Sequence, residues 1–159
     1  MSRLFDPVSL LNQDLGENET RRELLPIGEV IAQIGKLKFA SGKIQNGERA
    51  GENWDRLDAS LEITDPAYLK GYADGEQTRA VTNLGVMLEM TPEGTIATGM
   101  NKNIRLGKLR EAAGVNGRPL GMLQGQMIRI MIGHKQHPTE LDSNGAPVML
   151  DEVTGFTRV

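Results

Sequence analysis

Five segments of the chain alternate apolar and polar residues, and this period of two constrains the fold more than any other feature of the sequence. The segments span residues 28–39, 54–63, 79–90, 126–135 and 148–156. Successive side chains of a strand point to opposite faces, so each segment predicts a strand with one buried face. The 19 glycines among 159 residues supply turns between them. We therefore expect a mainly β fold.

The first of these strands changes phase at Gly35. Apolar residues occupy even positions before this glycine and odd positions, Leu37 and Phe39, after it. A β-bulge at Gly35 would return both sets to one buried face and bend the strand, as a small barrel requires. Near the end of the chain, Asn144-Gly145 predicts a tight hairpin between the last two strands. These features favour a five-stranded barrel over residues 26–159.

One short helix is expected at about residues 103–113, within the stretch NKNIRLGKLREAAG. Asn101 or Asn103 can accept a backbone N–H bond at its start, and Gly114 can take the left-handed conformation that ends a helix. At about 100° per residue, three apolar side chains fall on one stripe that would pack on the barrel. These residues are Leu106, Leu109 and Ala113.

Residues 1–25 show no sustained period, and their segment LNQDLGENETRRE is dense in polar and charged groups. We interpret this region as an N-terminal arm and expect it to pack against another subunit or partner. Asp6 and Pro7 are placed to start a short helix there. The apolar residues that could anchor the arm are Phe5, Leu10, Leu11 and Leu15.

The net charge of -3 hides an uneven distribution along the chain. Residues 101–138 contain seven basic side chains and one acidic one, a local charge of +6. A positive field of this kind can attract a polyanion although the whole molecule is slightly acidic. A solvated basic face is an equally good interpretation of the charge alone.

Several function classes receive no support. The chain has no cysteine, and His134 and His137 lack companion ligands, so we expect no metal site. No nucleophile, paired-carboxylate or nucleotide-binding motif is present, and we predict neither an enzyme nor a cofactor. No apolar run approaches the roughly 20 residues of a membrane span, and the first residues do not resemble a signal peptide. We expect an intracellular protein.

Four stretches resemble a known family: LLPIGEVIAQI, WDRLDASLEI, NIRLGKLREAAGV and LQGQMIRIMI. The family comprises small phage-encoded proteins of the replication and recombination region. Its members begin the barrel with Leu-Pro-x-Gly-Glu-Tyr, where this chain has Val30 in place of the aromatic residue. They continue with a Leu-x-x-Leu-x-x-Ala-x-Gly helix and a Leu-x-Gly-x-x-Val-x-Val strand. The similarity spans about residues 24–159.

The resemblance implies an OB-like barrel and sequence-neutral binding of single-stranded DNA in the cytoplasm of an infected bacterium. Such a barrel can stack bases on aromatic side chains while lysines and arginines meet the phosphates. The aromatic candidates are Phe39, Trp54, Tyr68 and Tyr72, and the strand phase places Trp54 on the polar face with Arg56. The candidate nucleic-acid-binding residues are Lys36, Lys38, Lys43, Arg49, Trp54, Arg56, Arg105, Lys108, Arg110, Arg118 and Arg129.

A second hypothesis is a phage capsid decoration protein, in which a small barrel sits on the shell and the arm ties neighbouring subunits together. The arm, the acidic total and an aromatic content of only 4% favour this hypothesis, in which the partner is the major capsid protein and the location is the virion. The local charge of +6 favours DNA instead. An exposed edge strand and the arm lead us to expect a homo-oligomer in either case.

Overall fold

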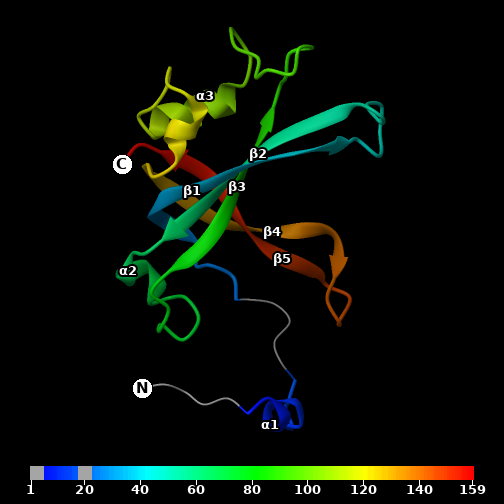
Figure 1. Cartoon of the computed structure of the whole chain (residues 1–159), viewed down its shortest axis with the longest axis vertical. Helices are drawn as coiled ribbons and strands as arrows, with labels where there is room; N and C mark the ends of the chain where they lie inside the picture. The colour runs from blue at the N-terminus through cyan, green and yellow to red at the C-terminus, as the bar shows by residue number, and fades with distance from the viewer. Residues whose placement is uncertain (1–5, 18–22) are drawn as a thin grey trace.

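The structure is a computed structural model that describes residues 6–17 and 23–159. It is mainly β, with five antiparallel strands in one sheet of order β3-β2-β1-β4-β5 (Figure 1). This architecture confirms the predicted fold class, and each strand overlaps one of the five alternating segments. The strands are β1 (Gly28–Lys43), β2 (Asn53–Ile63), β3 (Ala80–Leu88), β4 (Met127–Leu141) and β5 (Pro147–Thr157).

The sheet curls into a partly open barrel of the OB-like class. Its two edge strands, β3 and β5, contact each other but share no ladder, which leaves a seam between them. A helix, α3 (Ile104–Ala112), lies between β3 and β4 in the chain, as predicted. Together with the short 3-10 helix η1 (Leu120–Leu123), α3 lies at one end of the barrel (Figure 1).

Strand β1 is long and serves both halves of the sheet. Residues 28–33 pair with β4, and from Gln33 onward β1 pairs with β2. The β1–β2 register shifts between Ile34 and Leu37, which confirms the bulge predicted at Gly35. The bend lets one strand join two parts of a curved sheet. Beyond the bulge, β1 and β2 form a hairpin that projects from the barrel (Figure 1).

The core fills the inside of the barrel and the space under α3. Leu106 and Leu109 of α3 are buried, as the predicted stripe requires, and Gly114 has φ +74 where the helix ends. Burying each large apolar side chain stabilises the fold by about 1.5–3 kcal/mol. The largest fully buried strand residues are Ile34, Leu57, Leu61, Ile63, Leu84, Ile128, Ile130 and Ile132.

The start of α3 differs from the prediction. Asn103 occupies the N-cap position with φ +50, but its side chain makes no capping hydrogen bond. Its Oδ1 instead accepts from the Glu89 N–H (2.8 Å), and its Nδ2 donates to the carbonyls of Glu89 (2.9 Å) and Ala97 (2.8 Å). The predicted capping role is therefore wrong, because this asparagine ties the helix start to the chain that leaves β3.

Two shorter helices, α1 (Pro7–Leu11) and α2 (Pro66–Leu69), begin with an aspartate N-cap followed by proline. Hydrogen bonds from the Ser9 hydroxyl and the Val8 N–H hold the pKa of Asp6 below its ordinary value. No residue of α1 is buried, and the helix lies apart from the barrel (Figure 1). Of the predicted arm anchors, Leu10, Leu11 and Leu15 are exposed, and Phe5 lies outside the described residues.

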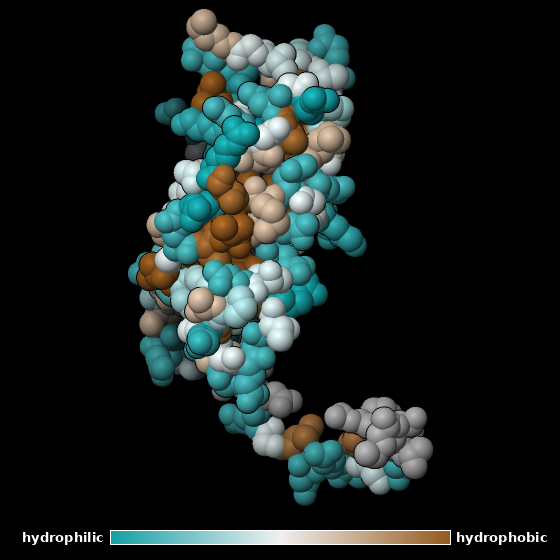
Figure 2. All heavy atoms as spheres, turned by 90° about the vertical axis from the view of Figure 1, so that its left-hand side faces the viewer, coloured by the Kyte–Doolittle hydropathy of each residue, from teal (hydrophilic) through white to brown (hydrophobic). Residues whose placement is uncertain are grey.

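Some apolar surface of the barrel also remains exposed. Met127 and Met131 of β4 point outward, and Figure 2 shows hydrophobic side chains in a band along one side of the barrel. Within residues 6–17 and 23–159, none of the helices is long and apolar enough to cross a membrane.

The segment that leads into β1 is held by three polar side chains. Asp151 accepts the Leu25 N–H (2.7 Å), and His134 Nε2 lies 2.6 Å from the Leu25 carbonyl oxygen. The Tyr68 hydroxyl donates to the Pro26 carbonyl (2.5 Å), and burial together with the Asp151 charge raises the pKa of Tyr68 to about 12. Tyr68 thus has a structural role through its hydroxyl, and its base-stacking role stays a prediction.

Tyr72 was the other tyrosine predicted to stack on bases. It is buried in the core, with 9% of its surface exposed, so its ring offers no face to a ligand. The prediction for Tyr72 is therefore wrong, because the short-range sequence pattern does not show what the chain after α2 packs against.

Substitution Tyr68→Phe should lower the free energy of unfolding by about 1 kcal/mol near neutral pH, because the Pro26 carbonyl loses its donor. Folding raises the pKa of Tyr68 from 10.0 to about 12, so the neutral phenol makes its full contribution to stability below pH 10. That stability is lost as the pH rises through the folded value. The free energy of unfolding of the wild type, measured in urea, should therefore fall between pH 10 and 12. It should fall less in Tyr68→Phe. Equal pH slopes for the two proteins would contradict this assignment.

Candidate nucleic-acid interface

The outward side of β2 forms an open surface that continues onto β1 and β3. Leu57, Ala59 and Leu61 point into the core, so the alternate residues face outward. On β1 the partners of the outward residues are small or basic: Gly42 faces Trp54, and Lys38 faces Asp58. We call this surface the stacking face and define it as Lys38, Trp54, Arg56 and Met87.

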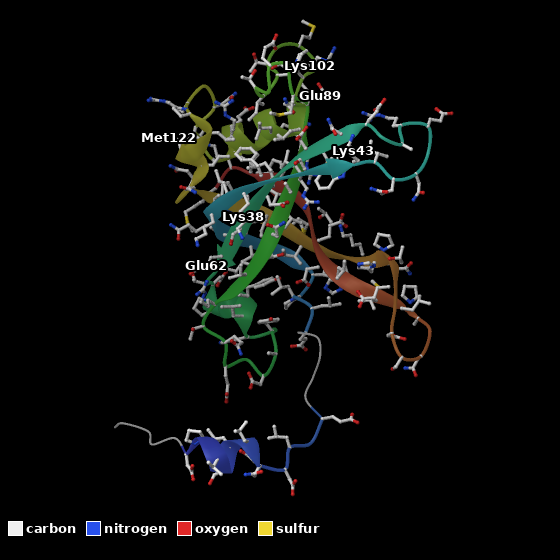
Figure 3. The ribbon with its side chains drawn as sticks, turned by 45° about the vertical axis from the view of Figure 1, so that its right-hand side comes forward. Lys38, Lys43, Glu62, Glu89, Lys102 and Met122 are labelled. Atoms are coloured by element: carbon white, nitrogen blue, oxygen red, sulfur yellow. The ribbon has the colours of Figure 1, made fainter. Side chains whose placement is uncertain are left out.

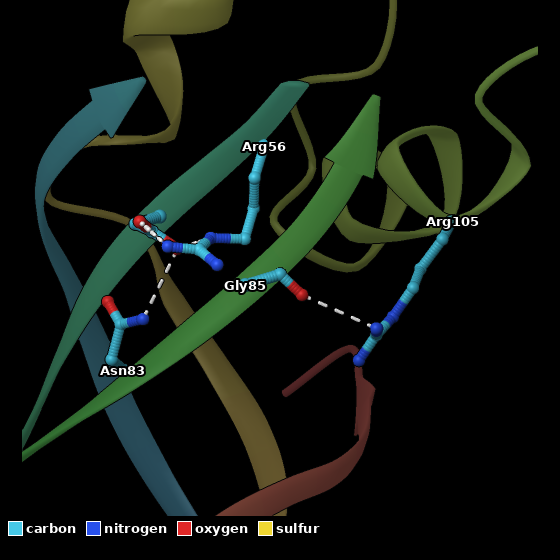
Figure 4. Close-up of polar contacts among 5 residues, drawn as sticks. Arg56, Asn83, Gly85 and Arg105 are labelled. Carbon is cyan, nitrogen blue, oxygen red and sulfur yellow. Dashed lines mark hydrogen bonds and ion pairs between the residues drawn. The ribbon is translucent and has the colours of Figure 1, made fainter. Parts of the chain in front are cut away.

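Trp54 and Arg56 contact each other on the stacking face. The guanidinium carbon of Arg56 lies 5.3 Å from the centroid of the Trp54 ring, which confirms that the two side chains share the polar face. Arg56 also binds Asp58 through two hydrogen bonds of 2.7 and 3.0 Å. Asn83 donates to the same carboxylate at 3.4 Å (Figure 4). The guanidinium is thus fixed between an aromatic ring and a carboxylate.

The ring of Trp54 rests on the backbone of β1 at Gly42. A Cβ atom at Gly42 would lie 2.7 Å from the ring, closer than real Cβ contacts. Gly85 of β3 plays a similar part for Arg56, since a Cβ there would lie 3.1 Å from Arg56 Cδ. The two strands that flank β2 therefore each place a glycine where Trp54 or Arg56 needs room.

A groove of about 870 Å³ runs along the seam between β3 and β5, and we call it the seam groove. Arg105 of α3 donates to the Gly85 carbonyl (3.3 Å) and lies 5.9 Å from the centroid of the Phe156 ring. Arg56 and Arg105 thus approach Gly85 from two sides (Figure 4). The charged residues that line the groove are Arg56, Arg105 and Lys135, together with Asp58, Asp142, Asp151 and Glu152.

The predicted basic residues of β1 and its hairpin lie near the stacking face. Lys38 belongs to it, and Lys36 is exposed at the bulge. Lys43 lies at the far end of β1 (Figure 3) and is exposed. Arg49, in the hairpin loop, pairs with Glu52 at 2.6 Å. Lys43 follows Gly42 in β1, so its side chain leaves the strand on the face opposite Trp54.

The other predicted cations do not form one surface. Arg110 donates to the carbonyl of Arg118, and Lys108 is exposed on α3. Arg129, on the outward side of β4, lies 3.5 Å from Glu29. None of these four residues lines the seam groove.

Lys102, also part of the basic segment, lies 3.5 Å from Glu89 (Figure 3). The basic side chains of residues 101–138 therefore do not gather on one surface. Of these side chains, only Arg105 and Lys135 line the seam groove.

Some residues of the interface were not among the sequence predictions. Asp58 follows Arg56 by two positions in the same strand, so the pattern contained a signal for their contact. Asn83 and Gly85 gave no such signal, because their positions beside Asp58 and Arg56 depend on the β2–β3 register. Lys135 was counted in the basic segment, but its place at the groove follows from the pairing of β4 with β5.

Comparison with known proteins adds no identification. The chain matches no protein-family model, and a search of curated proteins finds no significant match. The function is therefore argued from the described surface itself.

Substitution Gly42→Ala should displace the Trp54 ring, because the new methyl group would lie within 3 Å of the ring atoms. Since Trp54 is the single tryptophan, its fluorescence reports the change directly, and we expect a shift in emission wavelength. Gly155→Ala is the matched control, because a Cβ at this strand glycine meets no atom within 4 Å. An unchanged spectrum in Gly42→Ala would contradict the packing described.

Proposed function

We propose that this protein binds single-stranded DNA without sequence preference, in phage replication or recombination. The observation that supports the proposal best is the contact between Trp54 and Arg56 on an open sheet face, at a ring-to-guanidinium distance of 5.3 Å. An aromatic ring held flat on a strand accepts any base, because every base has a π face. An OB-like barrel uses this side of the sheet and the adjacent hairpin loop for oligonucleotides.

The surrounding charges suggest the path of the phosphates. A strand that stacks a base on Trp54 passes Lys38 on one side and the seam groove with Arg105 on the other. The remaining cation of the face, Arg56, is partly neutralised by Asp58 at 2.7 Å. We therefore propose about two phosphate contacts, from Lys38 and Arg105.

This arrangement predicts a modest dependence on salt. Each phosphate contact on a single strand contributes about 0.7 to the slope of log affinity against log salt concentration. Two contacts give a slope of about -1.4. Titration with oligo-dT at several salt concentrations, followed by Trp54 emission, should show quenching and this slope. Absence of binding at low salt would overturn the proposal. Binding without quenching would show that the DNA site does not include Trp54.

The second candidate function is capsid decoration, and the exposed apolar residues of the arm favour it. Val8, Leu11 and Leu15 contact no other part of the described core, and a shell protein could bind them. In this case deletion of residues 1–25 should abolish incorporation into virions. Unchanged incorporation of the truncated chain would remove this candidate.

A further inference from the structure

A groove of about 450 Å³ lies at the projecting hairpin, between β1 and the chain that follows β3, and we call it the hairpin groove. Phe39 of β1 lines this groove with 64% of its surface exposed. Most of this large aromatic side chain is therefore open to a ligand. The other apolar residues that line the groove are Ala40, Leu88, Met90 and Ile96.

One carboxylate shares the groove with the Phe39 ring. Asp55 of β2 pairs with Ser41 of β1, whereas Phe39 pairs with Leu57, so Phe39 and Asp55 are diagonal neighbours on one face of the hairpin. Such neighbours are about 7–8 Å apart, which lets one ligand contact both. Asp55 is the one charged residue among the described residues that line the groove. The hairpin groove thus combines an aromatic ring, apolar walls and a negative charge.

The carboxylate of Asp55 has no partner among residues 6–17 and 23–159. It makes neither a hydrogen bond nor an ion pair there, although Asp55 is half-buried. Lys43 lies on the same face of β1 as Ser41, but it does not line the groove. A half-buried carboxylate loses part of its hydration, and a charged donor restores the lost hydrogen bonds. The groove therefore favours a cationic ligand.

The opposite face of the same hairpin shows what a ring and a carboxylate can hold between them. On the stacking face, Arg56 lies 5.3 Å from the centroid of the Trp54 ring and 2.7 Å from the Asp58 carboxylate. The hairpin groove repeats the ring and the carboxylate, but no basic side chain of the described chain lines it. A guanidinium suits this pair best, because its planar group stacks on an aromatic face and donates two parallel hydrogen bonds to a carboxylate.

We propose that the hairpin groove binds an arginine side chain of a partner protein. The guanidinium pairs with Asp55 and stacks on Phe39, and the apolar stem of the arginine lies against Ile96. Phe39 and Asp55 belong to the core-side phase of their strands, whereas Trp54 lies on the outward phase. The site is therefore separate from the proposed DNA surface and does not depend on it. Its negative charge also disfavours phosphates.

Titration of the isotopically labelled full chain with the peptide acetyl-Ala-Arg-Ala-amide, followed by NMR, tests the proposal. We expect saturable shifts at the amides of Phe39, Asp55 and Ile96, with a dissociation constant in the millimolar range for one side chain. Asp55→Asn should weaken binding at least about tenfold, because it removes the charge. Phe39→Leu should weaken it about two- to thirtyfold, since it loses the ring but keeps apolar bulk.

Neither substitution should unfold the barrel, because Phe39 is largely exposed and Asp55 makes no bond to the described chain. Glu48→Gln is the matched control, because it removes the same charge from the loop of the same hairpin and Glu48 does not line the groove. It should bind the peptide as the wild type does. An uncharged peptide with norleucine in place of arginine should not bind.

Three outcomes would overturn the proposal. The first is no binding of the arginine peptide, or equal binding of the norleucine peptide. The second is that oligo-dT shifts the same amides, since the groove would then belong to the DNA path. The third is self-association of the wild type that Asp55→Asn abolishes, because the arginine would then come from a second copy. Loss of DNA binding in Trp54→Ala leaves the peptide titration unchanged, so the two proposals fail separately.

Discussion

Replacing Trp54 with alanine should weaken binding of oligo-dT by about five- to 150-fold, the equivalent of roughly 1–3 kcal/mol for one stacked base. The loss should be this large because Trp54 is the one aromatic ring of the stacking face. Of the other aromatic candidates, Tyr72 is buried and Tyr68 binds Pro26. Phe39 occupies the opposite phase of β1.

Two control variants accompany this measurement. Trp54→Phe should keep most of the affinity, because it retains an aromatic face. Met122→Ala, at an exposed residue of η1 that does not line the seam groove, should bind as the wild type does. Equal binding by Trp54→Ala and the wild type would mean that the bases stack elsewhere, even if DNA binding itself were present. The salt slope of Trp54→Ala should remain unchanged, since the cations are untouched.

Substitution Asn103→Ala should lower the free energy of unfolding by about 3–4 kcal/mol. Three hydrogen bonds of 2.8–2.9 Å join Asn103 to Glu89 and Ala97, and each contributes about 1 kcal/mol. The positive φ of +50 adds about 1 kcal/mol for a residue other than glycine or asparagine. Urea unfolding followed by circular dichroism measures the sum.

Asn103→Gly separates the two contributions. Glycine tolerates the positive φ but makes no side-chain hydrogen bond, so this variant should lose about 1 kcal/mol less than the alanine variant. Asn103→Asp should lie between the wild type and glycine, because its carboxylate still accepts the Glu89 N–H but donates nothing. A loss below about 1 kcal/mol in all three variants would show that the contact is not a significant link between β3 and α3.

The strands and the main helix could be predicted because their causes are local. A period of two marks each strand, and the phase change at Gly35 marks the bulge even before a partner strand is known. The stripe of Leu106 and Leu109 likewise needs no information beyond the helix itself. Proline and aspartate marked the start of α1 in the same way.

The polar contacts could not be predicted, because they join distant parts of the chain. Asparagine is a common N-cap residue, but the Asn103 amide bonds to the backbone groups of Glu89 and Ala97 and makes no capping bond. The partner of each arginine depends on strand register or on a neighbouring loop. The basic segment therefore looked uniform in sequence and is divided in space. Only the Trp54–Arg56 contact, which needs a single strand, was found in advance.

The two roles of β1 also bear on how the chain folds. The β1–β2 and β4–β5 hairpins close over short loops, whereas pairing Gly28 with Ile132 brings together residues more than a hundred positions apart. Long loops cost more entropy to close, so the two hairpins should form early and the β1–β4 ladder late. Gly35 thus lies where two independently formed units join. Mutations in the projecting part of β1 should therefore slow folding, whereas mutations in residues 28–33 should mainly speed unfolding.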